Sequence, residues 1–557
     1  MKNKTFKIVL TVIAALLVIA TSYYVTLPPI SIYSSEFWGF MLFVDIVILG
    51  AYFLIMLISG KVFGDSSQID IKSGHIDLGK ILGGKKKPKF VKIQLIVTAL
   101  AFVFVIIGSI ASSEMFNAKT YSSLIEVKNA DFSEIPETEY VSDIALMDTA
   151  SARILGARTL GTLADLVSQF NISDSYTQIA MQNSEGSSHP YKVAPLEYAS
   201  FFKWLQNGKN GIPGYVKVDA VEFEAEFVRL TGEKIKYSPS SYFSTDLTRA
   251  LRFAYPTAIF DSVFFEVDDT GHPYWVASAM KPNAGLFGAM DVDYVVTLDA
   301  CTGETAKYAP AEAPEWIDIV YSGNLVCEKY DWYGMLREGY LNSAFSQTNC
   351  VVTTDDFGYK IIGNDVYIFT GVTSTSNDEA NIGFILANSR TGEYSFYSVP
   401  GAEEYSAMAA AEGSVQQYRY TASFPSLVNV DGEATYIMVL KDASGIVKMY
   451  SMVNVENYNI VVTSDTQADV FQKYKAALAG SGKKPEADVL ESEEITVREI
   501  IYVTQNGGTT VYIKSDEGVF GMAFDESVLF IDEGDRVTVY YASKNEGGVT
   551  QISKIEK

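Results

Sequence analysis

Three long apolar runs open the chain, at residues 8–27, 37–59 and 93–112. Each run is close to the about 20 apolar residues that a helix needs to cross a bilayer. After the third run the pattern changes to short alternating segments separated by turn residues, which is typical of antiparallel strands and short helices. The pattern therefore predicts an α+β protein held by a three-helix transmembrane anchor at residues 1–112.

The lysines predict the orientation of this anchor. Three lysines precede the first run and eight lie in the connection 60–92, whereas the connection 28–36 has no Lys or Arg. Because positive residues stay on the cytoplasmic side, we expect the N-terminus in the cytoplasm and residues 113–557 outside a multi-pass cell-membrane anchor. A cleaved signal peptide is the alternative for the first run, but the residues after this run lack a small-x-small cleavage site.

One ionisable residue interrupts the second run. Asp45 lies roughly 12 Å from the outer end of the run at 1.5 Å per residue, near the middle of the bilayer. An acid at this depth is costly and is a functional candidate. The two other runs offer four polar partners: Thr11, Gln94, Thr98 and Ser109. Asp45 is therefore interpreted either as a protonated packing group or as a contact for a membrane partner.

A short phrase recurs in the second half of the chain. Residues 294–308 and 383–397 each combine a strand, an Asp or Asn, the turn Thr-Gly-Glu and a second strand. Glycine supplies the positive φ that such a turn needs, and the side chain of Asp299 or Asn388 can accept backbone amides of the turn. Turn chemistry therefore explains the phrase without a ligand. The segment 218–220 echoes it and is interpreted as a decayed copy.

Helical segments precede these phrases, which predicts tandem units that combine one helix with an antiparallel sheet. The predicted helices lie at 244–253, 332–345 and 403–418, with a further short helix at 196–205 before a strand at 214–228. The predicted domains are the anchor 1–112 with its cytoplasmic loop 60–92, a mixed α/β domain 113–243, repeat units 244–310, 311–400 and 401–475, a linker 476–494 and a small β-barrel 495–557.

Strand alternation singles out two aromatic residues of the first repeat unit. Tyr274 and Trp275 are neighbours in a strand and therefore point to opposite faces of the sheet. We expect one of them in the core and the other on an open face that contacts a partner. The terminal segment 495–557 consists of short β runs between turns, and this pattern suits a small closed barrel of the OB type.

Composition excludes several classes of function. The net charge of −24 lacks the basic footprint of nucleic-acid binding. Three cysteines in so long a chain are no disulfide framework, so we expect buried thiols and one disulfide at most. The sequence has no nucleophile elbow, no C-x-x-C and no histidines paired at helical spacing. We therefore assign no catalytic, cofactor-binding or metal-binding residue and expect a protein that is not an enzyme.

The helix 246–251, the strands 264–268 and 273–276 and the phrase 296–304 together resemble the PepSY family. The three spans and the repeats are also similar to a family of three-span surface proteins of Gram-positive Firmicutes. The resemblance implies units of the cell envelope that bind or restrain peptidases.

The leading hypothesis is a membrane-anchored protein that binds an envelope protein or peptide outside the cytoplasm, with Asp45, Tyr274 and Trp275 as candidate interaction residues. Two alternatives remain. One is an envelope enzyme that acts on a cell-wall polymer. The other is a subunit of a membrane complex, for which the lipid-embedded helices and Asp45 matter most.

Overall fold

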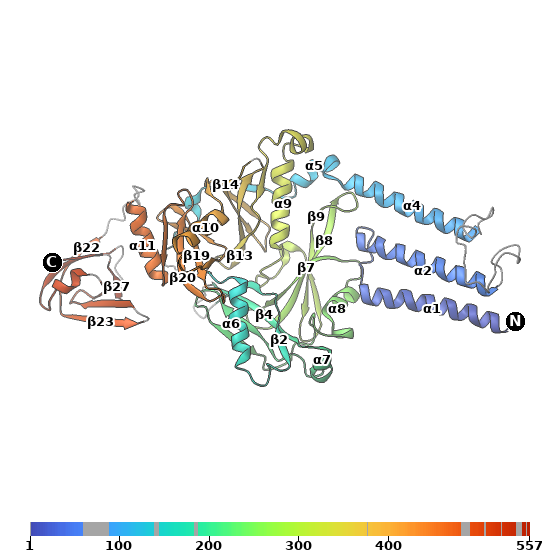
Figure 1. Ribbon diagram of the computed structural model, residues 1–557, viewed down its shortest axis with the longest axis horizontal. Coiled ribbons are helices and arrows are strands. Elements are labelled where there is room, and N and C mark those ends of the chain that lie inside the picture. The colour runs from blue at the N-terminus through green and yellow to red at the C-terminus, as the bar shows by residue number, and fades with distance from the viewer. Residues whose placement is uncertain are drawn as a thin grey trace. The chain divides into compact units, whose positions relative to one another are not determined.

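The computed structural model describes residues 2–59, 89–138, 144–182, 188–375, 377–480, 491–505, 508–524, 526–541, 549–552 and 554–557. Residues 60–88 of the predicted cytoplasmic loop and residues 481–490 of the predicted linker lie outside the described residues. The chain divides into two compact units, Met1–Lys473 and Tyr474–Lys557, and Figure 1 labels their helices and strands.

Three apolar helices form the anchor. They are α1 (Lys2–Thr26), α2 (Ser35–Ser59) and α4 (Lys89–Ser112), and all three are long and apolar enough to cross a membrane. Helix α2 packs against both α1 and α4 (Figure 1). Most of their large apolar side chains stay exposed in the protein itself, as expected when lipid is the surrounding solvent. The prediction of three helices that are long and apolar enough to span a membrane is confirmed.

Four modules follow between residues 144 and 473 of the described chain, and each has a helix before an antiparallel sheet. Module 1 contains α6 (Thr149–Gly161), β2 (Phe170–Ile172), β3 (Thr177–Gln182), β4 (Ser188–Tyr198), β5 (Gly214–Asp219) and β6 (Ala225–Arg229). Module 2 contains α8 (Leu247–Ala254), β7 (Ile259–Val267), β8 (Pro273–Ala284), β9 (Gly288–Asp299) and β10 (Thr305–Tyr308). The sheet order β10–β9–β8–β7 is a simple antiparallel meander.

The other two modules repeat this plan. Module 3 contains α9 (Gly323–Leu336), β11 (Val351–Thr353), β12 (Gly358–Ile362), β13 (Asp365–Ser374), β14 (Asn377–Asn388) and β15 (Tyr394–Tyr397). Module 4 contains α10 (Glu404–Ser414), β17 (Thr421–Ala422), β18 (Ser426–Val430), β19 (Glu433–Lys441), β20 (Val447–Asn454) and β21 (Val461–Ser464). The segment after the anchor joins module 3, because β1 (Val127–Ala130) pairs in parallel with β15.

Side-chain caps set where the helices α6, α8 and α9 of modules 1, 2 and 3 begin. Asp148, Asp246 and Ser322 each accept a hydrogen bond from a backbone amide three residues later, which satisfies one of the free donors at a helix start. The predicted helix 332–345 is wrong in its start, because the Ser322 cap begins α9 nine residues earlier. The predicted helix 196–205 is also wrong in part, because residues up to Tyr198 belong to β4.

The modules share hydrophobic cores instead of standing apart. One core combines Trp275 and Leu298 of module 2 with Ile179 and Val216 of module 1. A second core joins modules 3 and 4, and a third lies between modules 2 and 3. The modules therefore pack into one body within the first unit.

The terminal unit has a core of its own. One sheet contains β22 (Glu491–Thr496), β26 (Arg536–Tyr541) and β28 (Lys554–Glu556), and the other contains β23 (Glu499–Gln505), β24 (Gly508–Lys514), β25 (Val519–Ala523) and β27 (Val549–Gln551). Among the described residues these remain two sheets and form no closed barrel. Of the predicted linker, residues 476–480 continue α11 (Gln467–Gly480) and residues 491–494 belong to β22.

Candidate functional site

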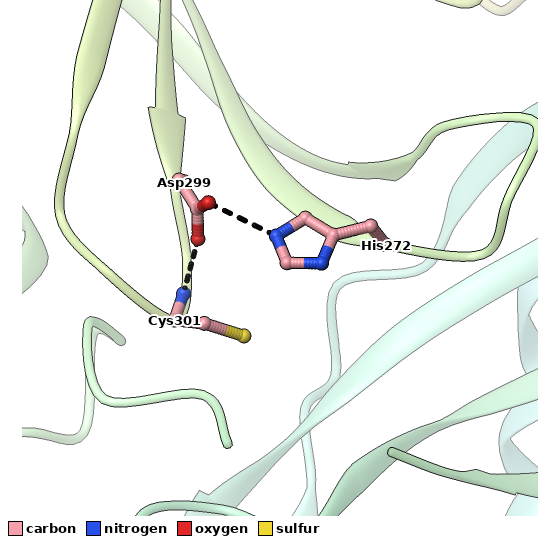
Figure 2. A group of neighbouring side chains, drawn as sticks. All are labelled: His272, Asp299 and Cys301. Carbon is pink, nitrogen blue, oxygen red and sulfur yellow. Dashed lines mark hydrogen bonds and ion pairs between the residues drawn. The ribbon is translucent and has the colours of Figure 1, made fainter. Parts of the chain in front are cut away.

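The end of module 2 brings together three side chains with different ligand chemistry (Figure 2). His272 precedes β8, Asp299 ends β9, and Cys301 lies in the turn that follows. The imidazole Nε2 of His272 lies 3.0 Å from Asp299 Oδ2. One donor atom from each of the three residues lies within 4.8 Å of the others.

Asp299 fixes the turn that carries the Thr-Gly-Glu phrase. Its Oδ1 accepts the backbone N–H groups of Cys301 at 2.7 Å and Thr302 at 3.0 Å. Partial burial raises the pKa of Asp299, but the hydrogen bonds from Thr302, Cys301 and His272 outweigh burial and leave the pKa below its usual range. Gly303 follows with φ 81°, a conformation that glycine adopts without steric cost. The predicted role of Asp299 in the turn is confirmed.

The pairing of Asp299 with His272 has a counterpart in every module. We call this pair the clasp. Its first member is the Asp or Asn that ends one strand. Its second member lies two residues before the residue that pairs with this Asp or Asn on the neighbouring strand. The other clasps are His189 Nε2 with Asp219 Oδ2 at 2.8 Å, Asn388 Nδ2 with Asp365 Oδ2 at 2.8 Å, and Asn454 Nδ2 with Glu433 Oε2 at 3.2 Å. The chemistry of the pair changes while its place in the fold does not.

Each clasp also ties the end of the meander to the start of the helix of its module. In module 2 the carbonyl of Ala300, next to Asp299, accepts the amides of Lys236 at 2.9 Å and Tyr237 at 3.0 Å, both in the segment before α8. The equivalent carbonyls make the same kind of contact in the other modules: Ala220 with Leu146 and Met147, Ser389 with Val320 and Tyr321, and Val455 with Ala402. The echo at residues 218–220 is therefore a full copy of the turn.

His272, Asp299 and Cys301 could together hold a metal ion, and imidazole, carboxylate and thiolate are the donors that Zn²⁺ prefers. The surrounding contacts argue against this role. The Cys301 thiol already has a partner, because its Sγ donates to the backbone carbonyl of Glu233 at 3.7 Å. Module 1 keeps the same pair, His189 and Asp219, without a cysteine in its turn. We therefore interpret the cluster as a structural clasp.

Tyr274 and Trp275 lie on opposite faces of β8, as predicted. Trp275 is the core member: it is 5% exposed, and its Nε1 donates to the carbonyl of Tyr237 at 2.8 Å. Tyr274 is half-buried. Its ring centroid lies 4.7 Å from that of Trp316 and 5.0 Å from that of His272.

The sequence predicted an open face of the sheet on the side of Tyr274. This prediction is wrong, because most of this face is covered. Val276 and Met280 point to this face and belong to the core between modules 2 and 3. The chain around Ile317 and Val320 covers them. Tyr274, near the start of the strand, therefore stays partly accessible, whereas Val276 and Met280 are buried.

Asp45 contacts the third anchor helix. Its Oδ2 accepts the hydroxyl of Thr98 at 2.6 Å, and its Oδ1 accepts the side-chain amide of Gln94. Two of the four predicted partners are therefore brought to Asp45, whereas Thr11 donates to the carbonyl of Lys7 and Ser109 to that of Val105 within their own helices. These contacts join α2 to α4 inside the apolar layer.

A buried pair of carboxyl groups was missed from the sequence. Glu266 of β7 accepts the backbone amides of Asp318 at 2.8 Å and Ile319 at 3.2 Å, and Asp318 accepts the amide of Ala180 of β3 at 2.9 Å. Burial raises the pKa of both carboxyl groups, and the charge of Glu266 raises that of Asp318 further. The pair links modules 1 and 2 to the segment before α9. Its signal in the sequence is an acid within each of two apolar runs.

Comparison with known proteins finds no family model that matches the chain and no curated protein that matches it. The resemblance to PepSY units and to three-span surface proteins of Firmicutes therefore stays a prediction.

Proposed function

We propose that this chain is a membrane-anchored interaction protein whose modules bind an envelope protein or peptide outside the cytoplasm. The anchor of three apolar helices supports attachment to a membrane. The charge of −24 favours a partner other than nucleic acid. PepSY-like restraint of a peptidase and a Gram-positive cell envelope belong to this proposal as the resemblance suggests them. An OB-like terminal unit belongs to it because of the short strands and turns of residues 495–557.

The recurrence of one clasped module four times carries the proposal. Repeated modules that share cores present a broad surface with several similar positions, and such surfaces commonly serve recognition. The half-buried pair His–x–Tyr occurs twice, as His189 with Tyr191 and as His272 with Tyr274. Aromatic side chains that are partly exposed and held by neighbours make good anchors for a partner.

Tyr274 is the best contact residue of this surface. Its ring is held from two sides by His272 and Trp316, so little conformational entropy is lost when a partner covers it. Tyr191 is the matching position of module 1, where the ammonium of Lys217 lies 4.6 Å from the ring centroid. The proposal therefore places partner contacts at the clasped ends of modules 1 and 2.

Photo-crosslinking in intact cells tests this proposal. A benzophenone amino acid at Tyr274 or Tyr191 of the full-length chain should give a discrete crosslinked product, and the same group at the exposed Tyr418 of module 4 serves as the control. The product should disappear when Tyr274→Ala is combined with the label at Tyr191. Products of equal yield from all three positions, or no product from either clasped end, would contradict the proposal.

The enzyme alternative has no equal support. The buried pair Glu266 and Asp318 has the raised pKa values that are common in active sites, but the two residues are 0% and 2% exposed and cannot reach a polymer. Incubation of the intact protein with cell-wall polymer and with casein distinguishes the two readings. Release of product that a single carboxylate substitution abolishes would overturn the binding proposal.

A further inference from the structure

An exposed aromatic patch lies where modules 1 and 2 meet. It combines residues of α7 (Phe201–Asn207), of the turn η3 (Phe243–Thr245) and of α8. Phe202 is 76% exposed, Phe243 55% and Phe253 54%. A contiguous apolar surface of this kind usually marks a contact. We call it the aromatic patch, with the members Phe201, Phe202, Leu205, Tyr242, Phe243 and Phe253.

Ring contacts hold most of the patch together. The centroids of Phe201 and Phe202 are 5.7 Å apart, those of Phe201 and Tyr242 are 5.0 Å apart, and Trp204 links the helix to Phe243 at 5.6 Å. The side chains are therefore ordered by one another although much of their surface is exposed. A rigid exposed aromatic surface loses little entropy when it is covered.

The patch is continuous with the last turn of the first anchor helix. The guanidinium of Arg249 lies 4.1 Å from the ring centroid of Tyr24 and donates to the carbonyl of Phe243 at 2.7 Å. The ring of Phe253 lies 6.4 Å from that of Tyr24, and Arg252 Nε donates to the carbonyl of Leu27 at 2.9 Å. Tyr24 marks the level at which the apolar helix leaves the bilayer, because tyrosines gather at the membrane interface.

The other edge of the anchor is arranged in the same way. Helix α5 (Glu114–Ser122) starts just beyond the end of α4, and its residues Met115 and Phe116 are 57% and 63% exposed. The hydroxyl of Ser112, the last residue of α4, accepts the amides of Leu286 at 2.7 Å and Phe287 at 3.0 Å. Since α2 packs against both α1 and α4, these two helices form the edges of the anchor (Figure 1), and exposed apolar side chains follow both of them in the fold.

We propose that the aromatic patch lies in the interface of the bilayer that the anchor spans, so that modules 1 and 2 rest on the lipid surface. Phenyl and indole rings and leucine are the side chains that interfacial helices bury at this depth, and basic residues beside them contact lipid phosphates. Lys203 within α7 and Lys209 just after it supply such charges. The bilayer is the occupant because the patch begins at the residue where the membrane helix ends.

This contact limits how the modules can tilt. The hydrogen bonds at Leu27 and Ser112 hold module 2 at two points of the anchor, and lipid contact of the patch adds a third support beside α1. The clasped ends of modules 1 and 2 would then keep a fixed height above the membrane. The inference depends on the anchor and not on the proposed partner, so either can fail without the other.

Spin-label accessibility in the full-length protein, reconstituted in lipid nanodiscs, tests the inference. A nitroxide is attached at Phe202→Cys or Phe253→Cys, with Tyr458→Cys of module 4, whose side chain is 52% exposed, as the matched control. Wild-type protein treated in the same way gives the background of the native thiols. Oxygen partitions into lipid, whereas a nickel chelate stays in water, so the ratio of their collision rates reports immersion.

We expect the oxygen-to-nickel ratio at Phe202 and Phe253 to exceed the ratio at Tyr458 several-fold. A ratio equal to that at Tyr458 would show that the patch faces water and would overturn the inference. Protection from both reagents would show that protein covers the patch, and this result would overturn it as well.

Discussion

Replacing Trp275 with alanine tests the assignment of the core at module 2. Trp275 is 5% exposed and its ring centroid lies 5.2 Å from that of Phe265 in an edge-on arrangement. Truncation of a large buried aromatic side chain leaves a cavity and costs about 3–5 kcal/mol of unfolding free energy. Its neighbour Tyr274 is half-buried, so Tyr274→Ala should cost clearly less.

Trp275→Phe separates the two contributions of the indole. Phenylalanine keeps the apolar contact with Phe265 but removes the N–H that donates to the carbonyl of Tyr237. Loss of a buried partner costs about 1–3 kcal/mol, so this variant should fall between wild type and Trp275→Ala. These contacts predict that the free energy of unfolding decreases in the order wild type, Trp275→Phe, Trp275→Ala.

Urea unfolding followed by tryptophan fluorescence measures this ranking. All five tryptophans lie in the first unit, at positions 38, 204, 275, 316 and 332, so the signal reports this unit alone. Helical content by circular dichroism provides a second reading for the variants that lack Trp275. The assignment of the core fails if Trp275→Ala costs no more than Tyr274→Ala.

Three further predictions concern the other sites. Burial raises the pKa of Glu266 and Asp318, so the folded protein keeps protons that the unfolded chain releases. This contribution to stability is lost as pH rises through the raised pKa values. The urea midpoint should therefore fall between about pH 5 and about pH 8, and it should fall less steeply in Glu266→Gln. Asp45→Leu leaves Gln94 and Thr98 without their acceptor and should weaken packing of the anchor helices by about 1–2 kcal/mol, whereas Asp45→Asn should have a mild effect. The resistance of the helices to unfolding by SDS measures the loss of packing. Equal resistance of wild type and Asp45→Leu would show that Asp45 has no role in packing. Asp299→Ala should cost about 1–3 kcal/mol of unfolding free energy because two turn amides lose their acceptor. Asp299→Asn should cost less, since Asn388 accepts the equivalent amides in module 3. Zinc titration by calorimetry should give the same heat before and after Cys301→Ala.

The anchor and the repeat plan could be predicted because their signals are local. An apolar run of about 20 residues has few stable alternatives to a membrane helix, and the Thr-Gly-Glu turn depends on contacts within five residues of Asp299. Helix starts were less accurate where the cap lay outside the apolar stretch, as Ser322 does for α9.

The copy of the repeat in module 1 was hidden because its turn reads Glu222-Phe223-Glu224 where modules 2 and 3 have Thr-Gly-Glu. The positions of Gly303 and Gly392, with φ 81° and 72°, are matched in module 1 by Phe223 with φ 59°. A phenylalanine in the left-handed region costs about 1–2 kcal/mol, so the sequence rule that looks for glycine passes over this turn. The clasp of Asp219 and the backbone contacts of Ala220 hold the conformation, and the ring packs edge-on against Tyr450 of module 4 at 6.4 Å.

The buried acids could not be predicted from alternation. In β7 the neighbours Phe265 and Val267 point into the core shared with module 1, so the alternation directs Glu266 to the other face, which the sequence suggested to be open. The segment around Asp318, more than fifty residues later, closes this face and supplies the amides that Glu266 accepts. One module is covered by the next through contacts between residues that are far apart in the sequence, and a local sequence pattern does not predict such contacts.

The four clasps occupy the same position in each module, but the side chains that form them differ. The pair is His with Asp in modules 1 and 2, Asp with Asn in module 3 and Glu with Asn in module 4. Each combination matches a donor to an acceptor, because an acid is never placed opposite an acid at this position. A ligand site common to all four modules would need the same donor atoms in each copy, whereas a turn needs only a complementary pair. The cluster at Cys301 is therefore better explained by the turn than by a metal, and the search for a partner belongs at the aromatic residues beside the clasps.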